Sequence, residues 1–314
     1  MKKQTWIQEF SVAEDGFYGQ LYRPEKDSYP NKAALILGGA GVPYAATLME
    51  AEAFAEMGIT SLAVGYFGVK DTPKALMRVP IEYVEKAADR LHSMDVRTVI
   101  AVGISKGAEL ALVAASLLPQ INAVIAFSPS ARVNMGIGIG MSWVNASSWT
   151  FRGEELPYAY TSASGLRAIW DSIRARELTF LPVYERANHS APSDTIIPVE
   201  KIQGPILLAA AEYDSLWPSA EACSEMTSRL DAHGFAYPHK QLIYRYASHL
   251  LLPFETNYAR YFRVGRQFPE ECMATVHELR REVLEFMRDA GTPEQAMREC
   301  RLRLTDGIRY LMGE

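Results

Sequence analysis

The residues from Thr98 onward constrain the fold of this chain more than any other segment. Thr98–Val102 is apolar and mostly β-branched, which predicts a buried strand. Gly103-Ile-Ser-Lys-Gly107 follows, and Ala108–Leu118 is rich in alanine and leucine without glycine or proline, which predicts a helix. A Gly-x-Ser-x-Gly motif between a strand and a helix is typical of a sharp turn that exposes its serine, here Ser105. The two glycines suit such a turn, because it brings the backbone close to its neighbours. A glycine-flanked surface turn is the alternative, and the flanking strand and helix disfavour it.

Strands and helices alternate on both sides of this motif. The predicted strands are 33–37, 60–67, 98–102, 123–127, 202–211 and 240–246, and the predicted helices are 45–57, 80–94, 108–118 and 219–233. This alternation predicts a parallel sheet with helices on both faces. Residues 5–24 predict a hairpin or two short edge strands. Together with the serine turn, the pattern predicts an α/β fold of the α/β-hydrolase type, with a mostly parallel central sheet.

We expect one domain over residues 1–314, because a chain of this length with 48% hydrophobic residues can bury one large core. Residues 131–200 interrupt the alternation, and we interpret them as a cap-like insertion over the carboxyl edge of the sheet. Their aromatic residues could line a substrate pocket or form a small separate core. These residues are Trp143, Trp149, Phe151, Tyr158, Tyr160, Trp170 and Tyr184.

Residues 258–289 are predicted to form an extra helical insertion. Over 270–289 the pattern is amphipathic, and one apolar stripe contains Met273, Val276, Val283 and Phe286. A helix that packs on the core, a lid and a dimer contact are the alternatives for this segment, so a homo-oligomer is left open.

Composition and charge exclude several classes of partner. The net charge of −5 argues against nucleic-acid binding, which usually requires clustered basic residues. No run approaches about 18 apolar residues, and residues 1–10 contain no apolar signal-peptide core, so we expect neither a membrane span nor secretion. Cys223, Cys272 and Cys300 are far apart, without metal-ligand spacing. We therefore expect a cytoplasmic protein with no cofactor or metal.

A nucleophilic serine needs a base, and the base needs an orienting carboxylate. Ser105, Asp214 and His249 occur in the order Ser, Asp, His, and each follows the carboxyl end of a predicted strand. The carboxyl ends of parallel strands meet at one edge of a sheet, so these residues are predicted to converge. Glu212 is the alternative acid. The competing residues lie in helices, in the insertion or in other connections: His92, His189, His233, His239, His277, Asp171, Asp194 and Asp231.

Backbone N–H groups near Ser105 are predicted to bind the oxyanion of the reaction. One is the N–H of Lys106, and the other comes from Ala40, Gly41 or Val42, in the glycine-rich loop after strand 33–37. A flexible turn or a phosphate loop are the alternatives, and no Lys-Ser or Lys-Thr follows to favour the latter. The Lys106 side chain is not needed for this chemistry, so we expect it to point to solvent or to pair with a carboxylate.

Several segments resemble the catalytic domain of the acyl-CoA thioesterase and bile acid-CoA:amino acid N-acyltransferase family. The resemblance runs with gaps from about residue 30 to the C-terminus. It is carried by Gly103-Ile-Ser-Lys-Gly-Ala-Glu-Leu110, Thr72-Pro-Lys-Ala-Leu76, Pro80-Ile-Glu-Tyr-Val-Glu-Lys-Ala87, Phe151-Arg-Gly-Glu-Glu-Leu-Pro157, residues 197–208, Asp214-Ser-Leu-Trp-Pro-Ser219, His249-Leu-Leu-Leu-Pro253 and Gly291-Thr-Pro-Glu-Gln-Ala296.

The resemblance implies the same triad of Ser105, Asp214 and His249. The family's mammalian enzymes carry an N-terminal β-sandwich domain, which we do not expect in the roughly 30 residues that precede this core. Residues 258–289 have no obvious counterpart in the family.

The leading functional hypothesis is a serine hydrolase of acyl thioesters, such as acyl-CoA, or of related carboxylic esters, acting through an acyl-enzyme. An acyltransferase that passes the acyl group to an amine is the second hypothesis. The resemblance implies a cysteine nucleophile in the transferase branch, so Ser105 favours hydrolysis. A carboxylesterase and a catalytically inactive binding protein complete the alternatives.

Overall fold

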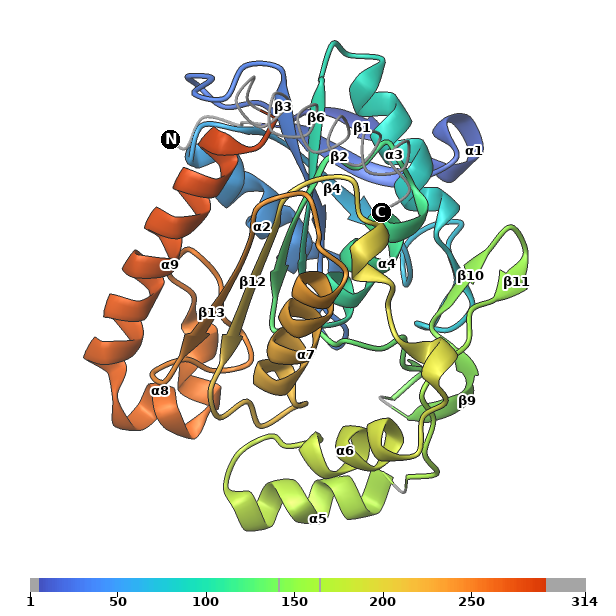
Figure 1. The fold of residues 1–314 in the computed structure, drawn as a ribbon, viewed down its shortest axis with the longest axis vertical. Helices are drawn as coiled ribbons and strands as arrows, with labels where there is room; N and C mark the ends of the chain where they lie inside the picture. The colour runs from blue at the N-terminus through green and yellow to red at the C-terminus, as the bar shows by residue number, and fades with distance from the viewer. Residues whose placement is uncertain (1–5, 141, 164, 292–314) are drawn as a thin grey trace, which may run out of the picture.

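The structure is a computed structural model that describes residues 6–140, 142–163 and 165–291. One eight-stranded sheet runs through the molecule in the order β1-β2-β4-β3-β6-β7-β12-β13 (Figure 1). Its strands are β1 (Trp6–Phe10), β2 (Tyr18–Tyr22), β3 (Lys32–Leu37), β4 (Thr60–Gly65), β6 (Thr98–Ile104), β7 (Ala123–Phe127), β12 (Ile206–Ala211) and β13 (His239–Tyr244). β2 pairs antiparallel with β1 and β4, and the pairs from β4 to β13 are parallel. The predicted α/β fold with a mostly parallel sheet is therefore confirmed.

Helices cover both faces of the sheet, which explains why the central strands are apolar on both sides. The core on one face includes side chains of α3 (Glu82–His92), α4 (Lys106–Leu117) and α7 (Ser219–Ala232). The core on the other face includes α2 (Tyr44–Glu56) and α9 (Pro269–Asp289). In β6 every residue is buried, with Val99 in the first core and Ile100 in the second.

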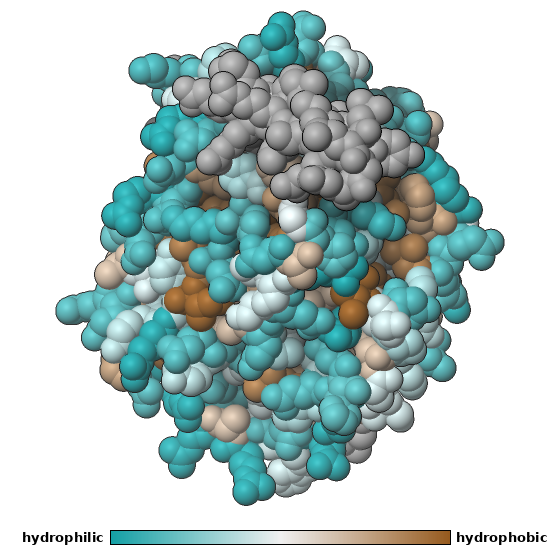
Figure 2. Space-filling model, in the orientation of Figure 1, coloured by the Kyte–Doolittle hydropathy of each residue, from teal (hydrophilic) through white to brown (hydrophobic). Residues whose placement is uncertain are grey.

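Figure 2 shows the hydropathy of the side chains on one face of the molecule. Outside the grey atoms, hydrophilic side chains predominate on this face, and the apolar patches are small and separate. No helix in the described ranges combines the length and the apolar character that a bilayer crossing requires.

The apolar stripe predicted for the last described helix is confirmed for Val283 and Phe286, which pack on the core, and wrong for Met273. The buried residues of α9 are Thr275, Leu279, Val283 and Met287, spaced by four. Of the predicted stripe only Val283 is buried, and Met273 is 37% exposed. The Lys32 ammonium donates to the carbonyls of Met287 and Arg288 at 3.0 and 2.6 Å, which ties the end of α9 to β3.

Within residues 131–200, α5 and α6 lie beyond the carboxyl ends of the strands (Figure 1), and the described parts of this segment are called the 131–200 layer below. The elements are β8 (Met135–Ile137), β9 (Trp143–Ser147), β10 (Trp149–Phe151), β11 (Glu154–Glu155), α5 (Gly165–Ala175), α6 (Leu181–His189) and two 3₁₀ turns, Ser193–Thr195 and Val199–Lys201. β10 pairs with β5 (Val79–Pro80), which ties this layer to the main core. Thr179 Oγ1 and the backbone N–H of Phe180 donate to the Ser215 carbonyl, so the layer also contacts the loop after β12.

Three short elements complete the described chain. α1 (Val12–Asp15) lies between β1 and β2, as part of the predicted edge hairpin. The 3₁₀ helix η3 (Asn257–Tyr261) and α8 (Arg263–Gln267) precede α9. Residues 258–289 are therefore mostly helical, as predicted from the sequence. Of the segment Gly291–Ala296, which resembles the family, only Gly291 belongs to the described residues. Cys300 also lies outside the described residues.

Candidate active site

Ser105 lies in a strained turn at the carboxyl end of β6. Its φ of 57° and ψ of −121° are unusual for a residue with a side chain. A Cβ atom at Gly107 would lie 1.9 Å from the Leu37 carbonyl oxygen, and one at Gly103 would lie 2.2 Å from the Gly107 carbonyl oxygen. Both approaches are far inside van der Waals contact, so the turn requires glycine at each position. The serine turn therefore has the geometry that the motif predicted.

The three predicted triad residues lie within hydrogen-bond distance of one another. Ser105 Oγ is 2.8 Å from His249 Nε2. His249 Nδ1 is 2.8 Å from Asp214 Oδ2 and 3.0 Å from Oδ1. In the arrangement that suits base catalysis, Nδ1–H donates to the carboxylate and the serine hydroxyl donates to Nε2. The loops after β6, β12 and β13 thus bring Ser105, Asp214 and His249 together.

Neighbouring groups hold Asp214 in place. The Leu216 N–H donates to Asp214 Oδ1 at 2.9 Å, and the Ser219 hydroxyl donates to Oδ2 at 2.6 Å. These donors stabilise the ionised carboxylate and fix its orientation toward the imidazole.

The backbone and ring of His249 are also held. Ser128, at the carboxyl end of β7, donates from its hydroxyl to the His249 carbonyl at 2.7 Å. The Trp217 ring lies edge-on to the imidazole, and its Nε1 donates to the Ser128 carbonyl. Sequence reasoning missed the positioning roles of Ser128, Trp217 and Ser219. Ser128 could have been noticed from its place directly after a predicted strand, next to Pro129.

The competing candidates lie away from this site. Glu212, the alternative acid, is exposed, and so are His189 and His277. His92 bonds through its ring nitrogens to the carbonyls of Val96 and Gln120, both at 2.8 Å, so it links two loops. His233 and His239 bond to Arg229 and Asp231 respectively.

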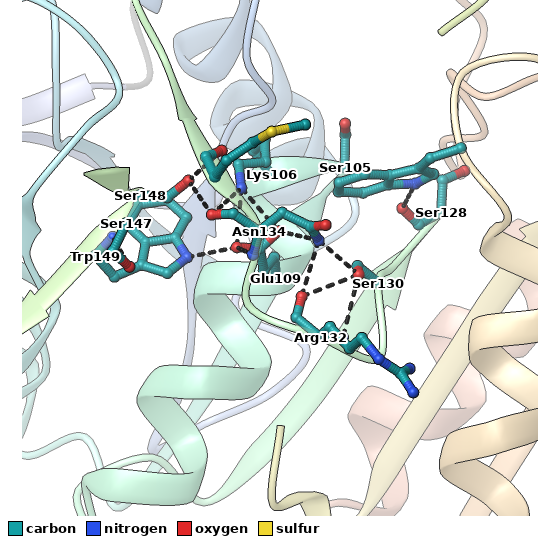
Figure 3. Close-up of polar contacts among 12 residues, drawn as sticks. Ser105, Lys106, Glu109, Ser128, Ser130, Arg132, Asn134, Ser147, Ser148 and Trp149 are labelled. Carbon is teal, nitrogen blue, oxygen red and sulfur yellow. Dashed lines mark hydrogen bonds and ion pairs between the residues drawn. The ribbon is translucent and has the colours of Figure 1, made fainter. Parts of the chain in front are cut away.

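The Lys106 side chain is buried in an ion pair beside Ser105 (Figure 3). It is 1% exposed, and its Nζ lies 2.8 Å from Glu109 Oε2 on the next turn of α4. Burial lowers the pKa of Lys106, and the Glu109 charge opposes this effect. Of the two expectations for Lys106, pairing with a carboxylate is confirmed and pointing to solvent is wrong.

Glu109 is the centre of a wider network that joins α4 to the 131–200 layer. It accepts hydrogen bonds from Trp149 Nε1 at 2.7 Å and from the Asn134 backbone N–H at 3.0 Å. Asn134 Nδ2 in turn donates to Ser130 Oγ at 2.8 Å, as Figure 3 shows. These hydrogen bonds are buried, and they join the first turn of α4 to β10, although Asn134 Oδ1 itself has no hydrogen-bond partner among the described residues.

The glycine-rich loop after β3 passes beside Ser105. A Cβ atom at Gly39 would lie 3.4 Å from the Ser105 Cβ, so no side chain separates this loop from the nucleophile. The Tyr66 hydroxyl donates to the Gly38 carbonyl, which anchors the start of the loop. Ala40, Gly41, Val42 and Lys106, the predicted oxyanion residues, all line the cavity that contains Ser105. Their N–H groups as oxyanion donors stay a prediction.

A mostly apolar cavity of about 270 Å³ opens at Ser105. Besides the glycine loop, Ser105, Lys106 and His249, it is lined by Ala46, Glu50, Ile104, Ile137, Leu178, Phe180, Tyr184, Leu216, Trp217, Leu250, Leu252, Tyr258 and Phe262. A second cavity of about 210 Å³ shares His249 and Phe262 with it. The sequence did not identify Glu50, Tyr258 or Phe262 as cavity residues.

Only one of the seven aromatic residues highlighted in 131–200 lines this cavity. Tyr184 does so, and it also belongs to a small separate core with Trp217. Trp149 is buried against Tyr66 and bonded to Glu109, so it belongs to the main core. Trp170 lies on α5 and is 70% exposed. The pocket interpretation of these aromatics is therefore wrong except for Tyr184, because most of them serve packing within the layer.

The remaining candidate ligand groups are the possible metal ligands and the cysteine thiols. Within the described ranges, no cluster of three or more His, Cys, Asp or Glu residues has a geometry that could hold a metal ion. Cys223 and Cys272 are free thiols, and burial raises the pKa of both.

Fold and site together define the α/β-hydrolase class: a parallel sheet with a serine turn after a central strand, and an acid and a histidine after the strands toward one edge. An esterase of Pyrococcus furiosus has the same fold, with a TM-score of 0.51 and 15% identity; the match covers 91% of this chain and 98% of that one.

The sequence comparisons narrow this class to a family. The family model described as BAAT / acyl-CoA thioester hydrolase C terminal matches residues 79–258, and the chain belongs to this family. Human acyl-coenzyme A thioesterase 1 is 28% identical over 68% of this chain and 47% of its own length. Rat acyl-coenzyme A amino acid N-acyltransferase 2 is 29% identical over 77% of this chain and 54% of its own length. The chain thus spans about half the length of the curated relatives it matches.

Proposed function

We propose that this protein hydrolyses acyl thioesters, such as acyl-CoA, or related carboxylic esters, with Ser105 as nucleophile, His249 as base and Asp214 as the orienting acid. The observation that carries the proposal is the unbroken chain of hydrogen bonds from Ser105 Oγ through His249 to Asp214. Membership of the thioesterase and acyltransferase family supports the thioester as substrate.

The reaction would begin when His249 Nε2 takes the hydroxyl proton of Ser105 and Oγ attacks the acyl carbonyl. The resulting oxyanion would accept hydrogen bonds from the Lys106 N–H and from one N–H of Ala40, Gly41 or Val42. Lys106 is the first residue of α4, so the positive end of the helix dipole adds to this stabilisation.

Collapse of the tetrahedral intermediate would break the bond to the leaving thiol or alcohol, which takes the proton from His249. Ser105 then carries the acyl group. Water, deprotonated by His249, attacks this ester, and the carboxylic acid leaves as Oγ regains its proton. Each step uses the same base, which explains why its orientation by Asp214 matters.

The layer of residues 131–200 would serve as a cap on a single hydrolase domain. Ile137, Phe180 and Tyr184 of this layer line the cavity at Ser105. Tyr258 and Phe262 complete its wall, so the start of the 258–289 insertion would act as part of the lid while α9 packs on the core.

An acyltransferase that passes the acyl group to an amine is the second candidate. The rat N-acyltransferase matches this chain as closely as the human thioesterase does, and this similarity favours it. An oxyester on Ser105 is less reactive toward amines than the thioester that a cysteine would form, so the serine favours transfer to water.

The test is the Ser105→Ala variant, assayed with an acyl-CoA and a p-nitrophenyl ester. We expect hydrolysis of both substrates to be abolished, because no other group at the site replaces the nucleophile, while Tm stays nearly unchanged. Ser190→Ala, at an exposed serine after α6, is the matched control and should keep full activity. Activity of Ser105→Ala at the level of the unaltered protein would refute the triad.

A substrate panel with and without free amine separates the alternatives. An amide product that grows with amine concentration would identify a transferase. Rates on oxyesters far above those on any thioester would identify a carboxylesterase.

A further inference from the structure

Glu50 is a buried carboxyl group that faces the cavity at Ser105. It lies in the second turn of α2 and is 7% exposed. The residues around it on this helix, such as Ala46, Ala51 and Phe54, are buried and apolar or small. Ala46 and Glu50 together form the α2 side of the cavity.

The carboxyl of Glu50 has no hydrogen-bond or ion-pair partner among the described residues, although its charge raises the pKa of the nearby Tyr66. No hydrogen bond or ion pair to it occurs there, and burial alone accounts for the shift of its pKa to about 8. The other two buried carboxyl groups of the site differ, because Glu109 is paired with Lys106 and Asp214 with His249. An unpartnered buried carboxyl destabilises a fold, so its presence at a cavity wall suggests that a ligand completes its hydrogen bonds.

The surroundings of Glu50 favour a neutral ligand group over a charged one. Val42, Leu250 and Leu252 line the same cavity, so the ionised form is poorly solvated there. At neutral pH most Glu50 carboxyls carry their proton, and a carboxylic acid both donates and accepts hydrogen bonds. The cationic groups at this cavity are occupied, since Lys106 is held by Glu109 and His249 by Asp214.

We infer that Glu50 is a specificity residue that hydrogen-bonds a neutral oxygen-bearing group of the substrate, a hydroxyl or a carbonyl. This inference rests on the proposed function. The oxygen could belong to the acyl chain or to an amide of the leaving group, and both sources have the same chemistry. A substrate that lacks such an oxygen leaves the carboxyl unpaired in the complex, which makes the site selective.

The experiment compares Glu50→Leu and Glu50→Gln with the unaltered protein in two arms. In the first arm the leaving group is p-nitrophenol, and a plain hexanoyl ester is compared with hydroxyhexanoyl and oxohexanoyl esters. In the second arm the acyl group is hexanoyl, and its CoA thioester is compared with its thioester of a plain alkyl thiol.

We expect Glu50→Leu to lower kcat/KM roughly tenfold, mainly through KM, for the oxygen-bearing substrates of one arm. The plain substrate of that arm should react unchanged or faster. Glu50→Gln keeps a donor and an acceptor and should retain the preference. The arm that responds identifies the source of the oxygen. Glu56→Leu, at an exposed position of the same helix, is the matched control.

Stability measurements separate recognition from a structural role. Glu50→Leu removes an unpaired polar group, so its Tm should equal or exceed that of the unaltered protein. An equal loss of activity on every substrate, a lowered Tm, or an unchanged ratio of polar to plain substrates would each overturn the inference. A selective loss on substrates that carry an ammonium group would overturn the assignment of a neutral ligand.

Different results would contradict the inference about Glu50 and the proposed function. Retained activity of Ser105→Ala contradicts the catalytic proposal, whereas an unchanged substrate ratio in Glu50→Leu contradicts only the assignment of Glu50.

Discussion

Glu109 and Glu50 are both buried near Ser105, yet only Glu109 is paired with a charge. Glu109 accepts from Lys106, Trp149 and Asn134, so its ionised form is fully bonded. Glu50 has no such donors, and burial raises its pKa to about 8. The same residue type thus serves as a structural anchor in one place and as a candidate recognition group in the other.

At the residue scale, Glu109→Gln should destabilise the fold strongly. The variant leaves the Lys106 ammonium buried without its counter-charge, which typically costs about 3–5 kcal/mol. Urea denaturation of the variant measures this loss as a lower midpoint.

The double variant Lys106→Met/Glu109→Gln is the control for this prediction. It removes both charges and keeps an acceptor for Trp149 Nε1, so it should recover much of the lost stability. A double variant as unstable as Glu109→Gln alone would show that the ion pair is not the cause.

At the element scale, the segment that links β13 to α9 contributes to two cavities. Phe262, between η3 and α8, is buried and lines both of them, while Tyr258 lines the cavity at Ser105. α9 itself packs on the core through the face that contains Leu279 and Val283. The first part of the 258–289 insertion therefore lines cavities, and the second part, α9, packs on the core.

Phe262→Ala should raise KM for long acyl chains roughly tenfold relative to acetyl substrates. The reason is that the variant removes apolar surface from the wall that such a chain would contact. Steady-state kinetics with p-nitrophenyl esters of increasing chain length provides the measurement. Met273→Ala, on the exposed side of α9, should leave the profile unchanged; an equal change in both variants would argue against a contact with substrate.

At the scale of the whole molecule, Glu50 couples global stability to pH. Its pKa is about 8 in the folded chain, well above the value of 4.5 for a solvated glutamate. Between these values the folded state holds a proton that the unfolded state has lost. The contribution of Glu50 to stability is therefore greatest below about pH 4.5 and falls as the pH rises toward 8.

Glu50→Gln removes this titration. We expect the free energy of unfolding of the variant, relative to the unaltered protein, to rise with pH by up to about 1.4 kcal/mol per unit over this window. Urea denaturation of both proteins between about pH 5 and 9 measures the difference. Burial and the charge of Glu50 both raise the pKa of Tyr66, so Tyr66 stays uncharged over this window in both proteins. A difference that is constant with pH would contradict the burial of an uncharged Glu50.

Short-range features of the sequence were sufficient for the serine turn and for a mostly parallel sheet. The turn needs Gly103 and Gly107 because backbone atoms approach within about 2 Å of where their side chains would begin, a constraint that is local and visible in the motif. Parallel strands place their carboxyl ends at one edge, so the positions of Asp214 and His249 after strands predicted that they meet Ser105.

Long-range packing decided the rest, because it depends on which distant segments share a face. Trp149 and Asn134 donate hydrogen bonds to Glu109 of the Lys106–Glu109 pair. The helical pattern of α4 alone does not show that these two distant residues contact the pair. Met273 was wrongly assigned to the apolar stripe of α9 for the same reason, since the buried face is set by contact with the sheet. Burial of Glu50 likewise follows from the way α2 packs beside the glycine loop. By itself the sequence thus determined the class of fold and the convergence of the triad, because both follow from local sterics and strand direction. Only the tertiary structure decided what surrounds the nucleophile, because burial and pairing are properties of residues brought together from far apart in the chain.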